Sequence, residues 1–211
     1  MPPATWAYAL LLSALFGIST AAAQTLPPVA EFYFDNDVAA VSVKLVPAET
    51  DDLVGTLMRH RERGRRAVEA NLQLADIAIA EGRNELAMTL YAEAIDAASA
   101  GSQLSRRVHW NAGWGMWRIG EPEKALDAWL RSLRDSRLSP SWAPPTLAMV
   151  LWELGRQRDA VAWYAAAVRT EPADWSDADN HARLLPDWQP RELGLLAQVH
   201  QAWQAAPPAW P

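Results

Sequence analysis

The sequence predicts an all-α fold built from about three repeated helical hairpins and closed by a carboxyl-terminal capping helix. The first observation is a ladder of residues that recurs three times with the same spacings of 7, 5, 4 and 3. The second is a glycine inside each ladder with polar residues directly after it, which is typical of a turn between two helices. The three ladders are Ala75-Gly82-Ala87-Tyr91-Ala94, Gly113-Gly120-Ala125-Trp129-Ser132 and Ala148-Gly155-Ala160-Tyr164-Ala167.

Composition excludes several classes of protein before any element is assigned. The 211 residues contain no cysteine, which excludes a disulfide scaffold, zinc knuckles and thiol nucleophiles. A formal net charge of -6 argues against a nucleic-acid binder. Of the 12 tryptophans, all but Trp6 lie between Trp110 and Trp210, and this concentration points to a binding surface.

The first 23 residues have the layout of a secretory signal peptide. Residues 6–18 form an uncharged apolar run, and small residues up to Ala23 follow it. The run is shorter than the roughly 20 residues that span a bilayer, so it does not predict a stable membrane anchor. We expect cleavage near Ala23 and a protein that is periplasmic or secreted.

Two segments precede the repeats. Residues 24–49 contain Pro27, Pro28 and Pro47 and predict an irregular arm. Within this arm, residues 41–45 alternate with period two, which is typical of a short strand or hairpin. Thr50 and the two acids after it form a helix start, so residues 50–66 predict a leading helix.

The repeats occupy residues 67–174, as units at about 68–101, 106–139 and 141–174. In each unit the small residues before and after the glycine let two helix backbones approach closely. The aromatic and small residues of the second helix share one face and should pack against the next unit. Residues 175–211 then predict a capping helix, which begins at Pro190 and covers the open end of the array, and a Pro-rich tail.

On these ladders the chain resembles the tetratricopeptide repeat family. The third unit follows the family pattern most closely, because Pro172 falls where that family usually ends its repeat. The middle unit departs from the pattern at His109 and Arg137, and the first unit departs at Asn71 and Ser99. The resemblance implies a right-handed superhelix of helix pairs, in which the first helix of each pair lines a concave groove. It also implies a protein that binds peptides or partner proteins in that groove.

A tryptophan stripe marks the predicted groove. Trp110, Trp114 and Trp117 are spaced i, i+4, i+7 and share a helix face away from the helix-pairing face. Three exposed indoles would make roughly 600 Å² of apolar surface, so something should cover them. The cover is the protein's own arm or tail, a bound peptide or sugar chain, or a second copy of the chain. The candidate groove residues are Trp110, Trp114, Trp117, Trp142, Met149, Trp152, Arg107 and Arg118, and the matching stripe of the first unit is Glu69, Leu72, Asp76 and Ile79.

Other sequence patterns are weaker indications of a functional site. Arg59–Arg66 contains five arginines, which form either a solvated helix face or a phosphate-binding patch. The four histidines are far apart, and neither metal-ligand spacing nor catalytic motifs occur. We therefore expect no catalytic residues, no metal site and no cofactor.

Two functions follow as hypotheses. The first is an exported binding module that captures an envelope protein or peptide in the tryptophan-lined groove. The second is a cell-wall or glycan-binding protein in which the same tryptophans stack on sugar rings. The sequence leaves the identity of the partner and the oligomeric state open.

Overall fold

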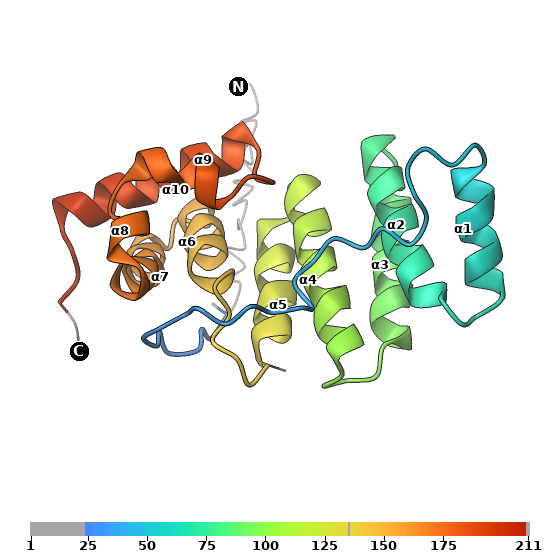
Figure 1. Cartoon of the computed structure of the whole chain (residues 1–211), viewed down its shortest axis with the longest axis horizontal. Helices are drawn as coiled ribbons and strands as arrows, with labels where there is room; N and C mark the ends of the chain where they lie inside the picture. Colours follow the sequence, from blue (N-terminus) through green and yellow to red (C-terminus); the bar gives the residue numbers. More distant parts are fainter. Residues whose placement is uncertain (1–23, 135, 210–211) are drawn as a thin grey trace, which may run out of the picture.

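The computed structural model describes residues 24–134 and 136–209, and the predicted signal peptide at residues 1–23 lies outside this range. The described chain is all-helical, and its helices pack as neighbouring hairpins in one array (Figure 1). The expectation of an all-α helical repeat is therefore confirmed. The leading helix is α1 (Leu53–Glu62), and the hairpins are α2 (Ala67–Ala80) with α3 (Asn84–Ala97), α4 (Gln103–Arg118) with α5 (Pro122–Arg134), and α6 (Ala143–Glu153) with α7 (Gln157–Thr170).

The ladder glycines end the first helix of each hairpin. Gly82, Gly120 and Gly155 have φ angles of 72°, 82° and 71°, a left-handed conformation that a side chain rarely tolerates. In each turn the residue after the glycine donates its N–H back into the helix, as Arg83 does to the carbonyl of Ala78 at 2.8 Å. This is the helix end that the glycine in each ladder predicts.

The small ladder residues are fully buried where the helices meet. Gly113 lies against the indole of Trp129, and the neighbouring Gly115 lies against the ring of Tyr91. A Cβ atom at either glycine would overlap these rings, so only glycine allows α4 to approach its neighbours this closely. Contacts between units run from α4 to α2 and α3, and from α5 to α6.

The amino-terminal arm, residues 24–52, is an extended segment that crosses the helices (Figure 1). Residues 41–45, where a strand or hairpin was expected, form neither. The reason is that their backbone bonds to helix side chains and not to a second strand. Within the described residues the arm makes one isolated parallel bridge, between Asp35 and Pro140.

The carboxyl-terminal segment closes the array. After α8 (Pro172–Trp175), η1 (Ala178–Asn180) and α9 (His181–Leu184), helix α10 (Pro190–Ala205) packs on both helices of the last hairpin. Gln189 and Glu192 form a capping box at its start, and Pro190 takes the first helical position. Leu196 and Val199 of α10 are fully buried against the last hairpin, as a solenoid cap requires.

Candidate functional site: a groove lined by the first helices

The first helices of the three hairpins, α2, α4 and α6, carry the candidate groove residues. Met149 is fully buried, Trp117 is 1% exposed, and Trp114 is 9% exposed. Trp110, Trp142, Trp152 and Arg107 are half-buried, and only Arg118 is exposed. Most of the predicted stripe is thus covered by other parts of the same chain.

The arm covers part of the groove through two side-chain carboxamides. Gln73 of α2 bonds the main chain of Val46 in both directions, accepting from its N–H at 2.9 Å and donating to its carbonyl at 2.7 Å. Asn111 of α4 accepts from Val43 N at 3.2 Å and donates to Val41 O at 3.0 Å. The arm therefore lies across the middle of α2 and α4 as an extended peptide that is held by its backbone.

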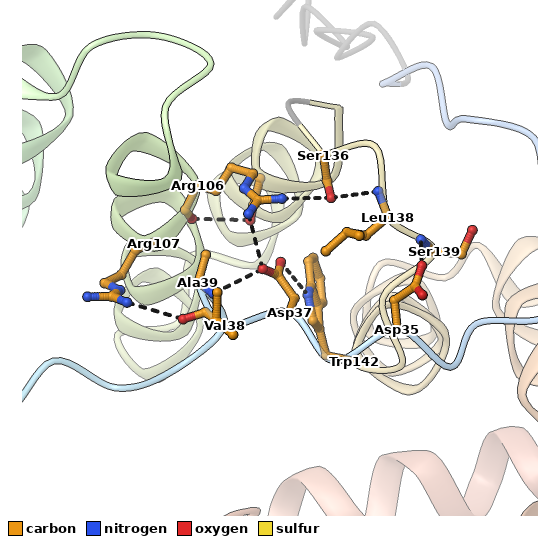
Figure 2. Close-up of polar contacts among 11 residues, drawn as sticks. Asp35, Asp37, Val38, Ala39, Arg106, Arg107, Ser136, Leu138, Ser139 and Trp142 are labelled. Carbon is orange, nitrogen blue, oxygen red and sulfur yellow. Dashed lines mark hydrogen bonds and ion pairs between the residues drawn. The ribbon is translucent and has the colours of Figure 1, made fainter.

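A buried carboxylate fastens the arm at the next repeat (Figure 2). The Asp37 side chain is fully buried and lies 3.4 Å from the Arg106 guanidinium. It also accepts the indole N–H of Trp142 at 3.3 Å and the N–H of Ala39 at 3.0 Å. Because its partners come from α4 and from the start of α6, Asp37 ties the arm to two repeats at once.

Two further contacts hold the arm around Asp37. Arg107 donates to the carbonyl of Val38 at 3.1 Å, and Asp35 accepts from Ser139 N at 2.6 Å (Figure 2). Two of the candidate groove residues, Arg107 and Trp142, thus bind the protein's own arm.

The segment that enters α10 covers the central tryptophans. The ring of Trp188 lies 5.5 Å from that of Trp114, and Trp114 also packs on Trp129 at 5.1 Å. Glu192 accepts the indole N–H of Trp117 at 3.2 Å, and the Arg191 guanidinium lies 4.6 Å from the centre of the Trp117 ring. The indole of Trp152 donates to Gln198 of α10 at 3.0 Å.

An open cleft remains where the stripes of the first two units meet. It has a volume of about 530 Å³ and lies between α2, α4 and the start of α10. From the predicted stripes it contains Asp76, Ile79 and Trp117, with Arg118 on the border. The remaining lining residues are Ala80, Gln189, Arg191 and Glu192.

The cleft holds charges of both signs. The hydroxyl of Tyr91 donates to Asp76 at 2.8 Å. Burial raises the pKa of Asp76, although this hydrogen bond and the positive charge of Arg118 act in the opposite direction. Arg118 is exposed and lines the cleft, where its positive charge acts on Asp76. The cleft can therefore bind a group that both donates and accepts hydrogen bonds.

Sequence reasoning missed the residues that fill the groove. Gln73, Asn111 and Asp37 hold the arm, and Trp188 and Glu192 cover the tryptophans. One signal was present, since Gln73 and Asn111 occupy matching positions next to the stripe residues Leu72 and Trp110. Glu192 could have been recognised from the capping-box pattern at Gln189, but its second contact, to Trp117, could not.

The basic cluster at Arg59–Arg66 is largely paired with acids. Arg59 bonds Asp52 at 3.1 Å, Arg61 bonds Glu93 at 2.7 Å, and Arg66 bonds Glu69 at 2.7 Å. Within residues 24–134 and 136–209, no cluster of three or more acidic or histidine side chains is arranged to hold a metal ion. The helices of the same residues are too short or too polar to cross a membrane.

Comparison with known proteins identifies one repeat. The tetratricopeptide repeat family model matches residues 68–100, which contain α2 and α3. The match falls on the first unit, although the third unit carries the terminal proline that is typical of the family. Searches of the curated proteins and of the solved structures give no match.

Proposed function

We propose that this chain, whose residues 68–100 match the tetratricopeptide repeat family model, is an exported binding module that captures a peptide segment of an envelope protein. Tetratricopeptide repeats serve as protein–protein interaction modules, which supports a protein partner. The observation that carries the finer proposal is the open cleft between α2, α4 and α10. It combines an apolar wall with opposite charges, as a peptide-binding surface requires.

Within this cleft each wall has a role in binding. Ile79 and Ala80 contact an apolar side chain of the partner. Arg118 donates to a carbonyl or carboxylate, and Asp76 accepts from an N–H group of the partner. The arm and α10 hold the other tryptophans in place, so that the binding surface is rigid before the partner arrives.

The proposed location is the bacterial periplasm. Its support is the apolar run at residues 6–18 followed by small residues up to Ala23. Amino-terminal sequencing of the protein recovered from a periplasmic fraction tests this proposal. A protein that begins at Gln24 supports it, and a cytoplasmic protein that retains Met1 contradicts it.

The burial of the central tryptophans favours a peptide over a glycan as the proposed partner. A stacking platform needs open indole faces, but Trp114 and Trp117 are buried, and Arg191 covers the Trp117 ring. Trp188 and Arg191 lie against the ring faces that a sugar would use, which favours a peptide as the proposed partner.

The test is a cross-linked capture from intact cells that compares the wild type with Arg118→Asp. Reversing this charge should abolish capture of a defined partner, because Arg118 lines the cleft and makes none of the described side-chain hydrogen bonds. The control is Arg158→Asp, which reverses an exposed charge on α7 outside the cleft.

Isothermal titration with the peptide mapped from the cross-link then gives the affinity. We expect Arg118→Asp and Ile79→Asp to weaken binding by at least about tenfold. Equal binding by the wild type and both cleft variants would place the partner on another surface.

A further inference from the structure

A second groove lies on the other side of the array, between α3 and α5. Its floor is apolar, with Ile95 from α3, Met116 from α4 and Ala128 from α5, and its volume is about 500 Å³. Charged residues of α5 form one rim, and Gln24, the first described residue of the arm, closes one end.

The next groove along the array, between α5 and α7, shows how such a groove is filled. The arm runs from the amino ends of α5 and α7, where Gln24 bonds Glu123 O and Arg156 at 3.1 Å each, to the carboxyl end of α7. There Tyr33 N bonds the hydroxyl of Thr170 at 3.1 Å, and the Tyr33 ring packs on Trp163 at 5.5 Å. Leu26 and Val29 pack on the same core.

The repeat relates the two grooves residue by residue. The third ladder follows the second by 35 residues, so Ala128 in the open groove corresponds to Trp163 in the filled one. The open groove thus lacks an indole at the position where the filled groove has one. A ligand that supplies its own indole would restore the missing packing.

The carboxyl-terminal tail has the composition to supply it. Residues 207–208 are a Pro-Pro pair with alanines on both sides and Trp210 directly downstream. The docked part of the arm also carries a Pro-Pro pair, at residues 27–28, between Leu26 and Val29 and upstream of Tyr33. Pro-Pro pairs keep a segment extended, so little conformational entropy is lost when it binds.

The tail is free to reach another molecule. Residues 204–209 are exposed, and the described chain leaves α10 at the end of the array opposite to α1 (Figure 1). The α3–α5 groove lies on the far side of α5 from the last hairpin, so the tail is directed away from the groove of its own chain.

We propose that the groove between α3 and α5 binds the carboxyl-terminal tail of a second copy of this chain, with Trp210 seated over Ala128. The tail and the groove are different surfaces, so the contact is head to tail and a pair of copies keeps one free groove on one copy and one free tail on the other. Self-association by this contact is independent of the cleft between α2, α4 and α10.

The first test measures binding of a labelled peptide with the sequence of residues 205–211 by fluorescence anisotropy. The receptor is the chain with residues 206–211 removed, which lacks only the exposed tail beyond α10. We expect saturable binding, and at least about tenfold weaker binding of the same peptide with Trp210→Ala. No binding, or equal binding of both peptides, overturns the proposal.

Receptor variants locate the peptide. Ala128→Trp fills the groove with the residue of the third unit and should reduce binding by at least about tenfold. Ile95→Gln, on the α3 side of the groove, should also reduce peptide binding. It replaces Ala128→Trp if circular dichroism shows that Ala128→Trp is unfolded. Ala97→Trp is the control, because it lies on the opposite face of α3 from Ile95. Binding that survives both groove variants overturns the proposed location.

Sedimentation velocity tests whether the full chain associates with itself. The sedimentation coefficient should rise with concentration for the wild type and for Ala97→Trp, and it should stay at the monomer value for Trp210→Ala. A wild-type chain that remains monomeric up to high micromolar concentration contradicts the proposal.

Discussion

At the scale of single residues, two helix-interior glycines control the packing of α4. Glycine usually weakens a helix by about 1 kcal/mol relative to alanine. Gly113 and Gly115 offset this cost because the rings of Trp129 and Tyr91 occupy the space of a side chain. The ladder already contained Gly113 as a small residue, but the role of Gly115 depends on Tyr91 from the preceding hairpin.

Gly115→Ala should therefore destabilise the protein by about 1–3 kcal/mol, because the new Cβ atom overlaps the Tyr91 ring. Chemical denaturation followed by circular dichroism measures the change. The matched control is Gly194→Ala in α10, where no atom lies within 4 Å of the new Cβ. This control should stabilise the protein by about 0.5–1 kcal/mol, and similar values for both variants would refute the packing argument.

His181 is a second residue whose burial should affect the stability of the protein. It is 3% exposed, and its Nε2 atom bonds the Tyr164 hydroxyl at 2.8 Å. The hydroxyl donates to the carbonyl of Trp175, so Nε2 of His181 carries the proton. Burial lowers the pKa of His181 to about 4. The folded protein therefore favours the neutral form of the His181 imidazole.

Because the pKa of His181 is about 6.5 in the unfolded chain and about 4 in the folded chain, unfolding takes up a proton between these values. Stability should be complete above about pH 6.5 and should fall as the pH drops towards 4, by on the order of 3 kcal/mol. Urea unfolding at a series of pH values measures this loss. His181→Phe should flatten the dependence and His60→Gln should retain it, whereas an unchanged slope in His181→Phe would rule out this histidine as the cause.

At the scale of elements, the arm binds across the helices as an extended peptide ligand would, although it belongs to the same chain. Its backbone is held by Gln73 and Asn111, and its one buried carboxylate is held by Arg106. The arm also carries exposed aromatic side chains, Phe32 and Phe34, which are 54% and 62% exposed. Phe32 has a φ angle of 60°, which costs a bulky residue backbone energy and allows Tyr33 to turn inward onto Trp163.

Asp37→Ala should destabilise the protein by about 3 kcal/mol, because it leaves the Arg106 guanidinium buried without its carboxylate. The double variant Asp37→Ala with Arg106→Met should recover a large part of this loss, and a double-mutant cycle by denaturation measures the coupling. As a control, Asp127→Ala breaks the exposed pair with Arg131 and should cost less than about 1 kcal/mol. Losses that simply add in the cycle would exclude a direct Asp37–Arg106 interaction.

At the scale of the whole molecule, the segments on both sides of the repeats cover the groove. The arm lies over α2 and α4, and the segment into α10 lies over Trp114, Trp117 and Trp152. The core has two clusters, one around α1 to α4 and one around the last two hairpins, and Met116 packs against both. The arm and α10 therefore hold the array together in addition to the stacking of the repeats.

Removal of residues 187–211 should expose Trp114 and Trp117, which Trp188 and α10 help to cover. We expect a melting temperature at least about 10 °C lower, since several buried apolar side chains lose their cover. Thermal unfolding measures the shift, and binding of a hydrophobic dye reports the exposed surface. The control removes residues 206–211 only and should melt like the wild type. A similar melting temperature for both truncations would contradict the role of α10 as a cap.

The sequence alone determined the hairpins, because the ladder is local. A glycine that ends one helix, and small residues that allow the next helix to approach, act within about 20 residues of one another. The same logic placed Asp76, Ile79, Trp117 and Arg118 on the groove-side helices, and the structure brings these four residues together in one cleft. The repeat spacing carries this information, since equivalent positions on stacked units face the same side.

Only the tertiary structure decided what covers the groove. The arm reaches Asn111 from a position 68 residues earlier in the chain, and Glu192 reaches Trp117 from 75 residues later. No periodicity links such distant residues, so a stripe of tryptophans looks the same in sequence whether solvent, a ligand or the protein's own ends lie against it. Which segment covers the groove depends on the space between α2, α4 and α6. It also depends on which segment fills that space with the least unpaired polar surface. This space forms only when the hairpins have stacked.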